Sequence, residues 1–427
     1  MSQKDRSNNI PPLTKKGMKT RKKLIDTAEE IFGTKGFFNT SIVDITQKAG
    51  VAQGTYYLYF SSKEEIFQEI LKELVNDYFN KLQREMAGVS NPKEELAVKY
   101  RFYFCWVKKR PNLNRLINQT MLVNKELYRW FLEATVSHHY EGLHEGIESG
   151  EFRDLDVNTM AHCITGIYAF IGWRWGYLED KQAPDDVVKD VLTFVFGGLE
   201  QREGKNNNSA FVSPEIPKSQ IQLPVTNDTV KQPLTPKGIK THKNLLEAAE
   251  ETYASKGYFN TSIVEITQKA GVAQGTFYVH FSSKQEIFEE LIKKLSRDFA
   301  TELYKETVKA DNIKEELVIR IRFLFRWMKI HRNLFSLVEQ AILVNEDLYR
   351  RFYENAISSY EKVLKAGMKT GEFKHLDTET MAYSLIGLTG LVGSRWIYLE
   401  DKEVPDYILD DVFKLIFHGL EQINERG

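Results

Sequence analysis

Long apolar runs are missing from this 427-residue sequence. No stretch approaches the roughly eighteen consecutive apolar residues that a membrane-spanning helix needs, and the first ten residues, MSQKDRSNNI, contain no apolar signal region. We therefore expect a cytoplasmic location and no membrane contact. Runs that alternate apolar and polar residues, as half-buried strands do, are also absent, so the expected fold class is all-α. Helical spacing and the Pro and Gly residues between the segments predict helices over residues 93–109, 112–121, 125–149, 157–180 and 185–201.

No charge of one sign dominates, because 58 Lys and Arg stand against 59 Asp and Glu, for a net charge of −1. The distribution is uneven, however. Residues 1–72 carry 12 basic against 8 acidic side chains, and residues 231–294 carry 9 against 7, so the rest of the chain is acidic. The two basic segments favour contact with phosphates, whereas an acidic remainder would repel DNA.

The sequence does contain a long internal duplication. A shift of 221 residues aligns Leu13 with Leu234 and Glu200 with Glu421 without a gap. A period this long indicates two copies of a whole domain, and the length of the chain also predicts at least two domains. Residues 204–233, between the copies, are polar and contain several Asn and Pro, which is typical of a linker.

The duplication weakens two candidate sites. Cys105 and Cys163, the two cysteines, align with Arg326 and Ser384, so the copies share no disulfide framework. A conceivable metal cluster on one helix has no equivalent in the second copy, and we interpret its members as surface or pocket residues: His138, His139, Glu141 and His144. Since no nucleophile, metal or phosphate-loop motif is recognisable, we expect no catalytic residue, no metal and no cofactor.

Residues 40–60, TSIVDITQKAGVAQGTYYLYF, have the pattern of a helix-turn-helix. Thr40 or Ser41 can cap a first helix, and Gly50 supplies the turn. In the short helix that follows, Tyr56 and Phe60 share one face, which leaves the other faces for DNA. Residues 39–55 recur as residues 260–276 with one exchange, Asp44 for Glu265.

These residues resemble the DNA-binding domain of the tetracycline-repressor (TetR) family of bacterial regulators. The similarity lies in Asp44-Ile45, Ala49-Gly50-Val51, Gly54-Thr55-Tyr56-Tyr57 and Phe60-Ser61-Ser62-Lys63, whereas Thr46 stands where a small alanine is common. The resemblance implies two tandem TetR-like repeats with nine helices each. In each repeat a three-helix helix-turn-helix DNA-binding domain precedes a helical ligand-binding and dimerisation domain, whose last two helices form a four-helix dimer interface.

The domain boundaries expected on this basis follow the duplication. They are 14–72 and 234–293 for the DNA-binding domains, 73–203 and 294–425 for the ligand-binding and dimerisation domains, and 204–233 for the linker.

The resemblance also implies which residues contact DNA. Gln53 and Gln274 are the candidates for reading base edges, since glutamine can pair bidentately with adenine. Thr40, Thr55, Tyr57, Tyr59 and Lys63, with their counterparts, are expected to hold phosphates. The complete expected set is Thr40, Ser41, Ala52, Gln53, Gly54, Thr55, Tyr57, Tyr59 and Lys63 in the first repeat, and Thr261, Ser262, Ala273, Gln274, Gly275, Thr276, Tyr278, His280 and Lys284 in the second.

An effector pocket in each repeat is implied by the resemblance alone, because the aromatic residues concerned would serve equally well as plain core. Many aromatics and few convergent charges favour a small apolar or aromatic effector. Arg174 and Arg395 could anchor an anion, although pairing with the neighbouring Glu-Asp sequences is the favoured interpretation. The candidate pocket residues are Phe102, Trp106, Gln119, Phe131 and Thr165, and in the second repeat Phe323, Trp327, Gln340 and Phe352.

Together these features predict a ligand-responsive transcriptional regulator, most simply a repressor. Repeat 1 would pair with repeat 2 within the chain, and this pseudo-dimer would bind a near-palindromic operator in double-stranded DNA. One alternative is a small-molecule sensor or protein-interaction module with reduced DNA binding, although both recognition helices are intact. Another is an all-α enzyme that uses the histidine cluster or a buried carboxylate.

Overall fold

The computed structural model describes residues 14–110, 113–199 and 235–420. These residues form helices and no extended strand, which confirms the all-α class. None of the described helices is long and apolar enough to cross a membrane. The chain divides into two compact units, one of residues 1–80 and 112–131 and the other of residues 81–111 and 132–427. The expected linker, 204–233, lies outside the described residues.

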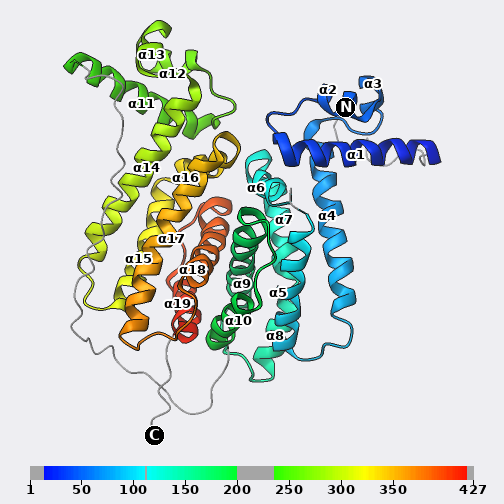
Figure 1. Ribbon diagram of the computed structural model, residues 1–427, viewed down its shortest axis with the longest axis vertical. Coiled ribbons are helices and arrows are strands. Elements are labelled where there is room, and N and C mark those ends of the chain that lie inside the picture. The colour runs from blue at the N-terminus through cyan, green and yellow to red at the C-terminus, as the bar shows by residue number, and fades with distance from the viewer. Residues whose placement is uncertain (1–13, 111–112, 200–234, 421–427) are drawn as a thin grey trace. The chain divides into compact units, whose positions relative to one another are not determined.

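The first unit contains the first helix-turn-helix. Leu24, Ala28 and Phe32 of its first helix, α1, recur at helical spacing and are completely buried. The rings of Phe32, Phe37 and Phe67 pack with centroids 5.2–5.6 Å apart, which fixes that helix against the others. The helices are α1 (Lys15–Lys35), α2 (Ile42–Ala49), α3 (Gln53–Tyr56), most of α4 (Lys63–Glu85), α6 (Leu113–Val123) and the start of α7 (Lys125–Ser137) (Figure 1).

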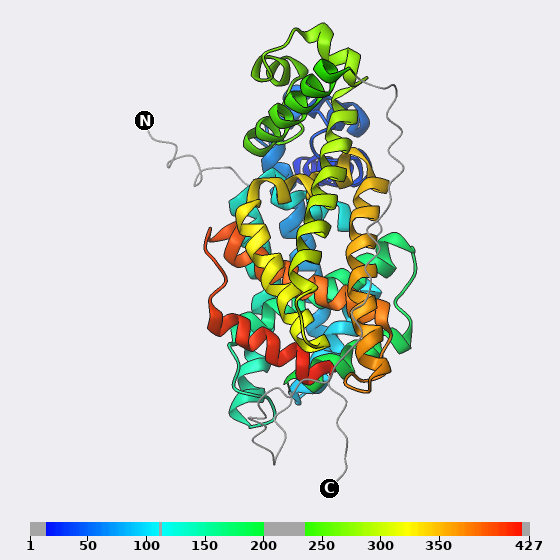
Figure 2. The same ribbon diagram turned by 90° about the vertical axis from the view of Figure 1, so that its left-hand side faces the viewer.

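The second unit contains the rest of repeat 1 and the whole described part of repeat 2. Figure 2 shows its second repeat, in which α11, α12 and α13 lie at one end of α14. From repeat 1 it has α5 (Pro92–Lys108), α8 (Tyr140–Glu148), α9 (Val157–Gly172) and α10 (Asp185–Leu199). From repeat 2 it has α11 (Pro236–Lys256), α12 (Ile263–Lys269), α13 (Gln274–His280), α14 (Lys284–Thr307), α15 (Ile313–Ile330), α16 (Arg332–Val344), α17 (Glu346–Lys369), α18 (Thr378–Gly393) and α19 (Asp406–Leu420).

One helix of repeat 1 is broken where its counterpart is continuous. The sequence predicts a single helix over residues 125–149, but the chain turns at His138-His139, between α7 and α8, whereas α17 runs unbroken. The amide of His139 bonds the carbonyl of Val136, and the carbonyl of His138 accepts a hydrogen bond from Lys99. The described residues of repeat 2 therefore form nine α-helices, and those of repeat 1 form ten.

A second departure concerns the helix predicted over residues 157–180. Its α-helical part ends at Gly172, and residues Trp173–Leu178 form a π-helical segment, η2, which repeats after α18 as η3 (Ser394–Leu399). Each segment leads to an aspartate with positive φ, Asp180 at 48° and Asp401 at 55°. A side chain tolerates this conformation best when it is Asn or Asp, so the residue type fits the turn.

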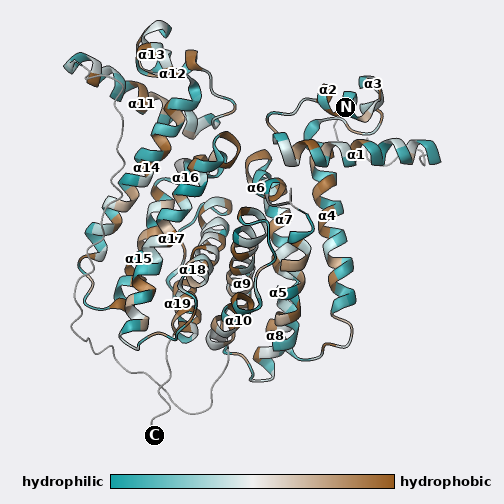
Figure 3. Cartoon of the chain, in the orientation of Figure 1, coloured by the Kyte–Doolittle hydropathy of each residue, from teal (hydrophilic) through white to brown (hydrophobic). Residues whose placement is uncertain are grey.

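The most apolar helix of the chain crosses its own counterpart in the second unit. α9, which is strongly hydrophobic (Figure 3), packs against α18, and α10 packs against α19. A Cβ on Gly166 would lie 2.2 Å from the carbonyl oxygen of Gly387, and a Cβ on Gly387 would lie 2.2 Å from the oxygen of Gly166. Only glycine permits this approach, because real Cβ atoms do not come so close to backbone.

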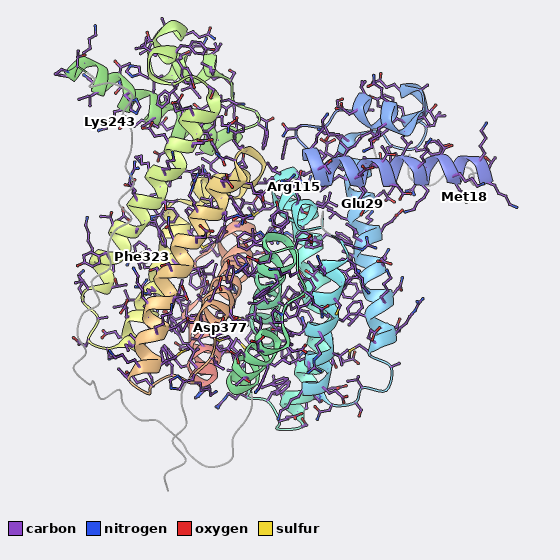
Figure 4. The ribbon with its side chains drawn as sticks, viewed as in Figure 1. Met18, Glu29, Arg115, Lys243, Phe323 and Asp377 are labelled. Carbon is purple, nitrogen blue, oxygen red and sulfur yellow. The ribbon has the colours of Figure 1, made fainter. Side chains whose placement is uncertain are left out.

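The contacts between the two repeats are reciprocal. The amide of Asp156 donates to Asp411 Oδ2 at 2.8 Å, and the amide of Asp377 (Figure 4) donates to Asp190 Oδ2 at 2.7 Å. Positions 156 and 377, like 190 and 411, are equivalent under the 221-residue shift. Equivalent positions of the two repeats therefore make equivalent hydrogen bonds to one another.

Candidate nucleic-acid interface and effector domains

The first helix-turn-helix is built by local hydrogen bonds. The Ser41 hydroxyl accepts from the Asp44 amide at 3.1 Å while the Asp44 carboxylate accepts from the Ser41 amide at 2.7 Å, a capping box that starts α2. Hydrogen bonds to the carboxylate from the Ser41 hydroxyl, from the Ser41 amide and from Lys35 lower the pKa of Asp44 to about 2. Gly50, at φ +63°, ends α2 in the left-handed conformation that suits glycine. Tyr56 of α3 is buried, and its hydroxyl donates to the Ser62 carbonyl at 2.8 Å.

The second helix-turn-helix repeats this construction. Ser262 and Glu265 form the capping box of α12, and hydrogen bonds from Lys256 and Ser262 lower the pKa of Glu265 to about 2. Gly271 takes φ +68° in the turn, and Phe277 stands buried in place of Tyr56. The one exchange in the motif, Asp44 for Glu265, therefore preserves the cap.

Several of the residues proposed to contact DNA are exposed in each second helix or directly after it. Gln53, Gly54 and Tyr57 are exposed, and so are Gln274, Gly275 and Tyr278. A Cβ added at Gly54 or Gly275 would meet nothing within 4 Å, so this face is open to a close backbone approach. Ala52 and Ala273 cap these helices and are exposed, whereas Thr55, Tyr59, Thr276 and His280 are half-buried at the edge of the face.

Thr40, Ser41 and their counterparts, which we expected to contact DNA, form hydrogen bonds within the head. Thr40 is 3% exposed and its hydroxyl donates to the Gly36 carbonyl at 2.7 Å, as that of Thr261 does to Gly257 at 2.8 Å. The Ser41 and Ser262 hydroxyls donate to the carboxylates of their capping boxes. A phosphate oxygen needs a donor, and a hydroxyl has one proton. In this structure the four hydroxyl protons are therefore donated to groups of the head itself, and contact with a phosphate stays a prediction.

Lys63 and Lys284 join the third helix of each motif to the loop before α2 or α12. The Lys63 ammonium donates to the carbonyls of Phe37 and Thr40 at 2.7 Å each and lies 4.2 Å from the centre of the Phe37 ring. Lys284 donates to the carbonyls of Tyr258 and Thr261 at 3.0 and 2.9 Å. Burial lowers the pKa of both lysines. An ammonium has three donors, and these bonds use two of them in each lysine.

Gln119 and Gln340 serve the DNA-binding heads, which differs from the pocket role that we expected. Gln119 is completely buried, and its Oε1 accepts from the amide of Phe37 while its Nε2 donates to the carbonyl of Arg115 at 2.7 Å. Gln340 Oε1 accepts from the amide of Tyr258 at 2.7 Å. Each amide thus ties the helix before α7 or α17 to the end of the first helix of its head.

Of the other candidate pocket residues, some are buried or half-buried and two line a groove. Trp106 and Thr165 are buried, while Phe102, Phe131 and Phe352 are half-buried. Phe323 (Figure 4) and Trp327 line a groove of about 140 Å³ between α14 and α15, together with Glu302, Glu306 and Arg326. Their rings pack on Phe299 at 5.4 and 5.1 Å. The two aromatics therefore belong to the core and present only an edge to the groove.

Of the histidines considered as a metal cluster, His138 and His139 lie in the interior, whereas His144, like Glu141, is exposed. The rings of His138 and His139 lie 3.9 Å apart, and burial lowers the pKa of His138 to about 3 and that of His139 well below its usual range. Within the described part of the chain, no group of three or more His, Cys, Asp and Glu side chains could hold a metal ion. Arg174 pairs with Glu179 at 2.5 Å and with Glu379 of the second repeat at 2.9 Å, which agrees with the ion-pair interpretation for this residue. For Arg395 the interpretation stays a prediction, since Asp401 pairs with Lys329 and Arg332 instead.

Sequence reasoning missed a polar cluster inside the second repeat. Glu339 of α16 accepts hydrogen bonds from the hydroxyls of Tyr353 at 2.7 Å and Tyr349 at 3.3 Å. The signal was available in the duplication, because Glu339 aligns with Asn118 and Tyr353 aligns with Leu132. Positions at which the copies differ in chemistry mark what one repeat does and the other does not.

Comparison with known proteins agrees with this architecture. Residues 24–70 and 245–291 both match the family described as bacterial regulatory proteins, tetR family. The HTH-type transcriptional regulator YvdT of Bacillus subtilis is 39% identical over 186 residues, which are 40% of this chain and 91% of that protein. The fatty acid metabolism regulator protein of Bacillus subtilis is 26% identical over 184 residues, 42% of this chain and 95% of that protein.

The other similarities also cover about one repeat. The HTH-type transcriptional repressor KstR2 of Mycolicibacterium smegmatis is 26% identical over 198 residues, 43% of this chain and 92% of that protein. A solved structure of FadR from Bacillus subtilis, in complex with stearoyl-CoA, is 23% identical with a TM-score of 0.38, and the match covers 42% of this chain and 98% of that one. This chain belongs to the tetR family of bacterial regulatory proteins and carries two family units in tandem, as a DNA-binding transcriptional regulator.

Proposed function

We propose that the chain is a ligand-responsive repressor that works as a single-chain pseudo-dimer on a near-palindromic operator. The observation that carries the proposal is the pair of recognition helices, which share the sequence Gln-Gly-Thr and expose its Gln and Gly. Two equal readers related by a two-fold axis prefer an operator with equivalent half-sites about one helical turn apart. The repressor sense rests on a relative, the repressor KstR2.

The pairing of repeat 1 with repeat 2 is supported by the reciprocal contacts of α9 with α18 and of α10 with α19. A linker at residues 204–233 would be about thirty residues long and could extend to roughly 100 Å, enough to join the end of one repeat to the head of the next. Because the partner is tethered, its effective concentration is high and internal pairing is favoured.

The proposed DNA contacts follow exposure. Gln53 and Gln274 would read base edges, and Thr55, Tyr57, Tyr59 and Lys63, with Thr276, Tyr278, His280 and Lys284, would contact phosphates. The effector would be a small molecule that is largely apolar or aromatic, which agrees with a relative named as a regulator of fatty acid metabolism. Since its target is DNA, the protein would act in the cytoplasm, and binding of DNA and effector requires no catalysis.

Genomic DNA fragments captured by the purified chain test the proposal. We expect enrichment of a few fragments that share a near-palindromic sequence, with an affinity that falls steeply as salt rises. Binding that is weak, insensitive to salt and without a shared sequence would instead favour the sensor or interaction module. The promoters recovered would also indicate the regulated genes and hence the effector.

A further inference from the structure

Glu339 of α16 is half-buried in the second repeat. Its two hydrogen-bond donors are the hydroxyls of Tyr349 and Tyr353, which are four residues apart on one face of α17 and are 4% and 6% exposed. No described lysine, arginine or histidine forms an ion pair with Glu339. A buried carboxylate without a cation is costly, and burial accordingly raises the pKa of Glu339.

Aromatic rings from both repeats surround the tyrosines that hold this group. Tyr349 and Tyr353 lie 4.9 Å apart, and Trp173 of repeat 1 lies 5.7 and 5.4 Å from them. Phe170 lies 5.6 Å from Tyr353. Trp173 is 6% exposed, and within the described residues its indole nitrogen has no hydrogen-bond partner. Four rings and one carboxyl group therefore converge where α9 and η2 of one repeat meet α16 and α17 of the other.

The equivalent positions of the other repeat indicate that the fold itself does not need this cluster. Glu339, Tyr353 and Trp173 align with Asn118, Leu132 and Ser394, so three of the four key positions change chemistry between the copies. The same helices are thus built without an acid and without this set of rings. A carboxyl group retained at such a desolvation cost, among aromatic rings, suits a ligand that brings the missing positive charge.

We propose that Glu339, Tyr349, Tyr353 and Trp173 form a binding site for an organic cation, a quaternary or protonated amine with apolar substituents, which is the effector of the second repeat. Aromatic rings attract a cation electrostatically, and the carboxylate would neutralise its charge inside the protein. The assignment rests on the proposed function in that it names the class of effector, and it implies one such site per chain.

Isothermal titration with matched probes tests this site on the full chain. Benzyltrimethylammonium and neopentylbenzene have nearly the same shape and differ by one positive charge. We expect the cation to bind with a stoichiometry of one per chain and to quench tryptophan fluorescence, and to bind about tenfold or more tightly than its neutral counterpart. Glu339→Gln, which keeps the shape, should weaken the cation about tenfold or more and leave the neutral probe unchanged.

Two further variants keep the test decisive. Glu403→Gln removes an exposed carboxylate on the same unit and should change nothing, while Tyr349→Phe keeps the ring and should reduce affinity less than Glu339→Gln. Equal binding of both probes, or unchanged cation affinity in Glu339→Gln, overturns the proposal, and so does absence of cation binding to the folded wild type. Salt-dependent DNA binding is measured on the same samples. If it persists without cation binding, only this inference fails, whereas cation binding without DNA binding contradicts the proposed function.

Discussion

At the scale of single residues, each helix-turn-helix has its own proposed base-reading glutamine. The contribution of each can therefore be tested by replacing one glutamine at a time. Gln53 and Gln274 are exposed at the start of α3 and α13. We expect Gln53→Ala to cost about 1–3 kcal/mol of operator binding and to relax base preference in one half-site. Gln274→Ala should do the same in the other half-site. Selection from a randomised operator library, read by sequencing, measures both.

The exposed Gln68 on α4 provides the matched control, since Gln68→Ala should leave the selected sequences unchanged. If Gln53→Ala alters neither half-site, the base-reading residue is another one. Leu58, 75% exposed in the turn that follows α3, would then be the next to test.

Lys63 has two roles that an experiment can separate. Its ammonium binds two carbonyls within the head, and we expect its third donor to meet a phosphate. Lys63→Ala should weaken binding to every DNA sequence alike and lower the salt slope by about one. It should also cost about 1–3 kcal/mol of local stability, because buried acceptors lose their partner. Salt-dependent DNA titration and hydrogen exchange of α1 amides measure the two effects independently, and an unchanged slope would leave Lys63 with a structural role alone.

At the scale of helices, the contact of α9 with α18 depends on glycine. Gly166→Ala would place a Cβ 2.2 Å from the Gly387 oxygen, so the helices must move apart. We expect a loss of about 1–3 kcal/mol or more in unfolding free energy. Gly390→Ala on α18 is the control, because its Cβ would meet only the Phe170 ring at 3.9 Å, and an added helical alanine is neutral or stabilising. Similar urea midpoints for the two variants would contradict the close contact.

The sequence predicted the helices better than it predicted their interruptions. Helices with caps and apolar spacing were found nearly to the residue, as for the one expected at 93–109 and observed as Pro92–Lys108. The break at His138-His139 was missed because it depends on Lys99, which is close in space but distant in sequence. The roles of Thr40 and Gln119 were missed for the same reason: composition shows that a polar group is present, but only packing shows which backbone group it satisfies.

At the scale of the whole molecule, the buried histidines of repeat 1 should make this repeat less stable at acid pH than repeat 2. Burial lowers the pKa of His162 to about 4, as it lowers those of His138 and His139. The unfolded chain titrates near 6.5, so below that pH it binds more protons than the folded one. The stabilising contribution of each neutral histidine should therefore be complete above pH 6.5. As the pH drops toward 4, the free energy of unfolding should fall by up to about 1.4 kcal/mol per pH unit for each histidine.

Urea unfolding between pH 7.5 and 5 measures this slope. His162→Gln should reduce the slope by about one proton, whereas His375→Gln, at an exposed position, should not. Repeat 2 has Ser359, Tyr360 and Tyr383 at the equivalent positions, so amide exchange should increase first in α8 and α9. Equal acid sensitivity of α17 would contradict the assignment.

The last prediction concerns the number of chains in the active particle. The helices that would otherwise dimerise, α9 and α10, are already covered by α18 and α19 of the same chain. Light scattering should therefore give the mass of one chain, 49.6 kDa, and DNA affinity should not fall on dilution. A protease site introduced into residues 204–233 should, once cleaved, make operator binding depend on protein concentration, because the tether no longer holds the halves together. A stable two-chain particle at low micromolar concentration would instead indicate that the repeats exchange partners between chains.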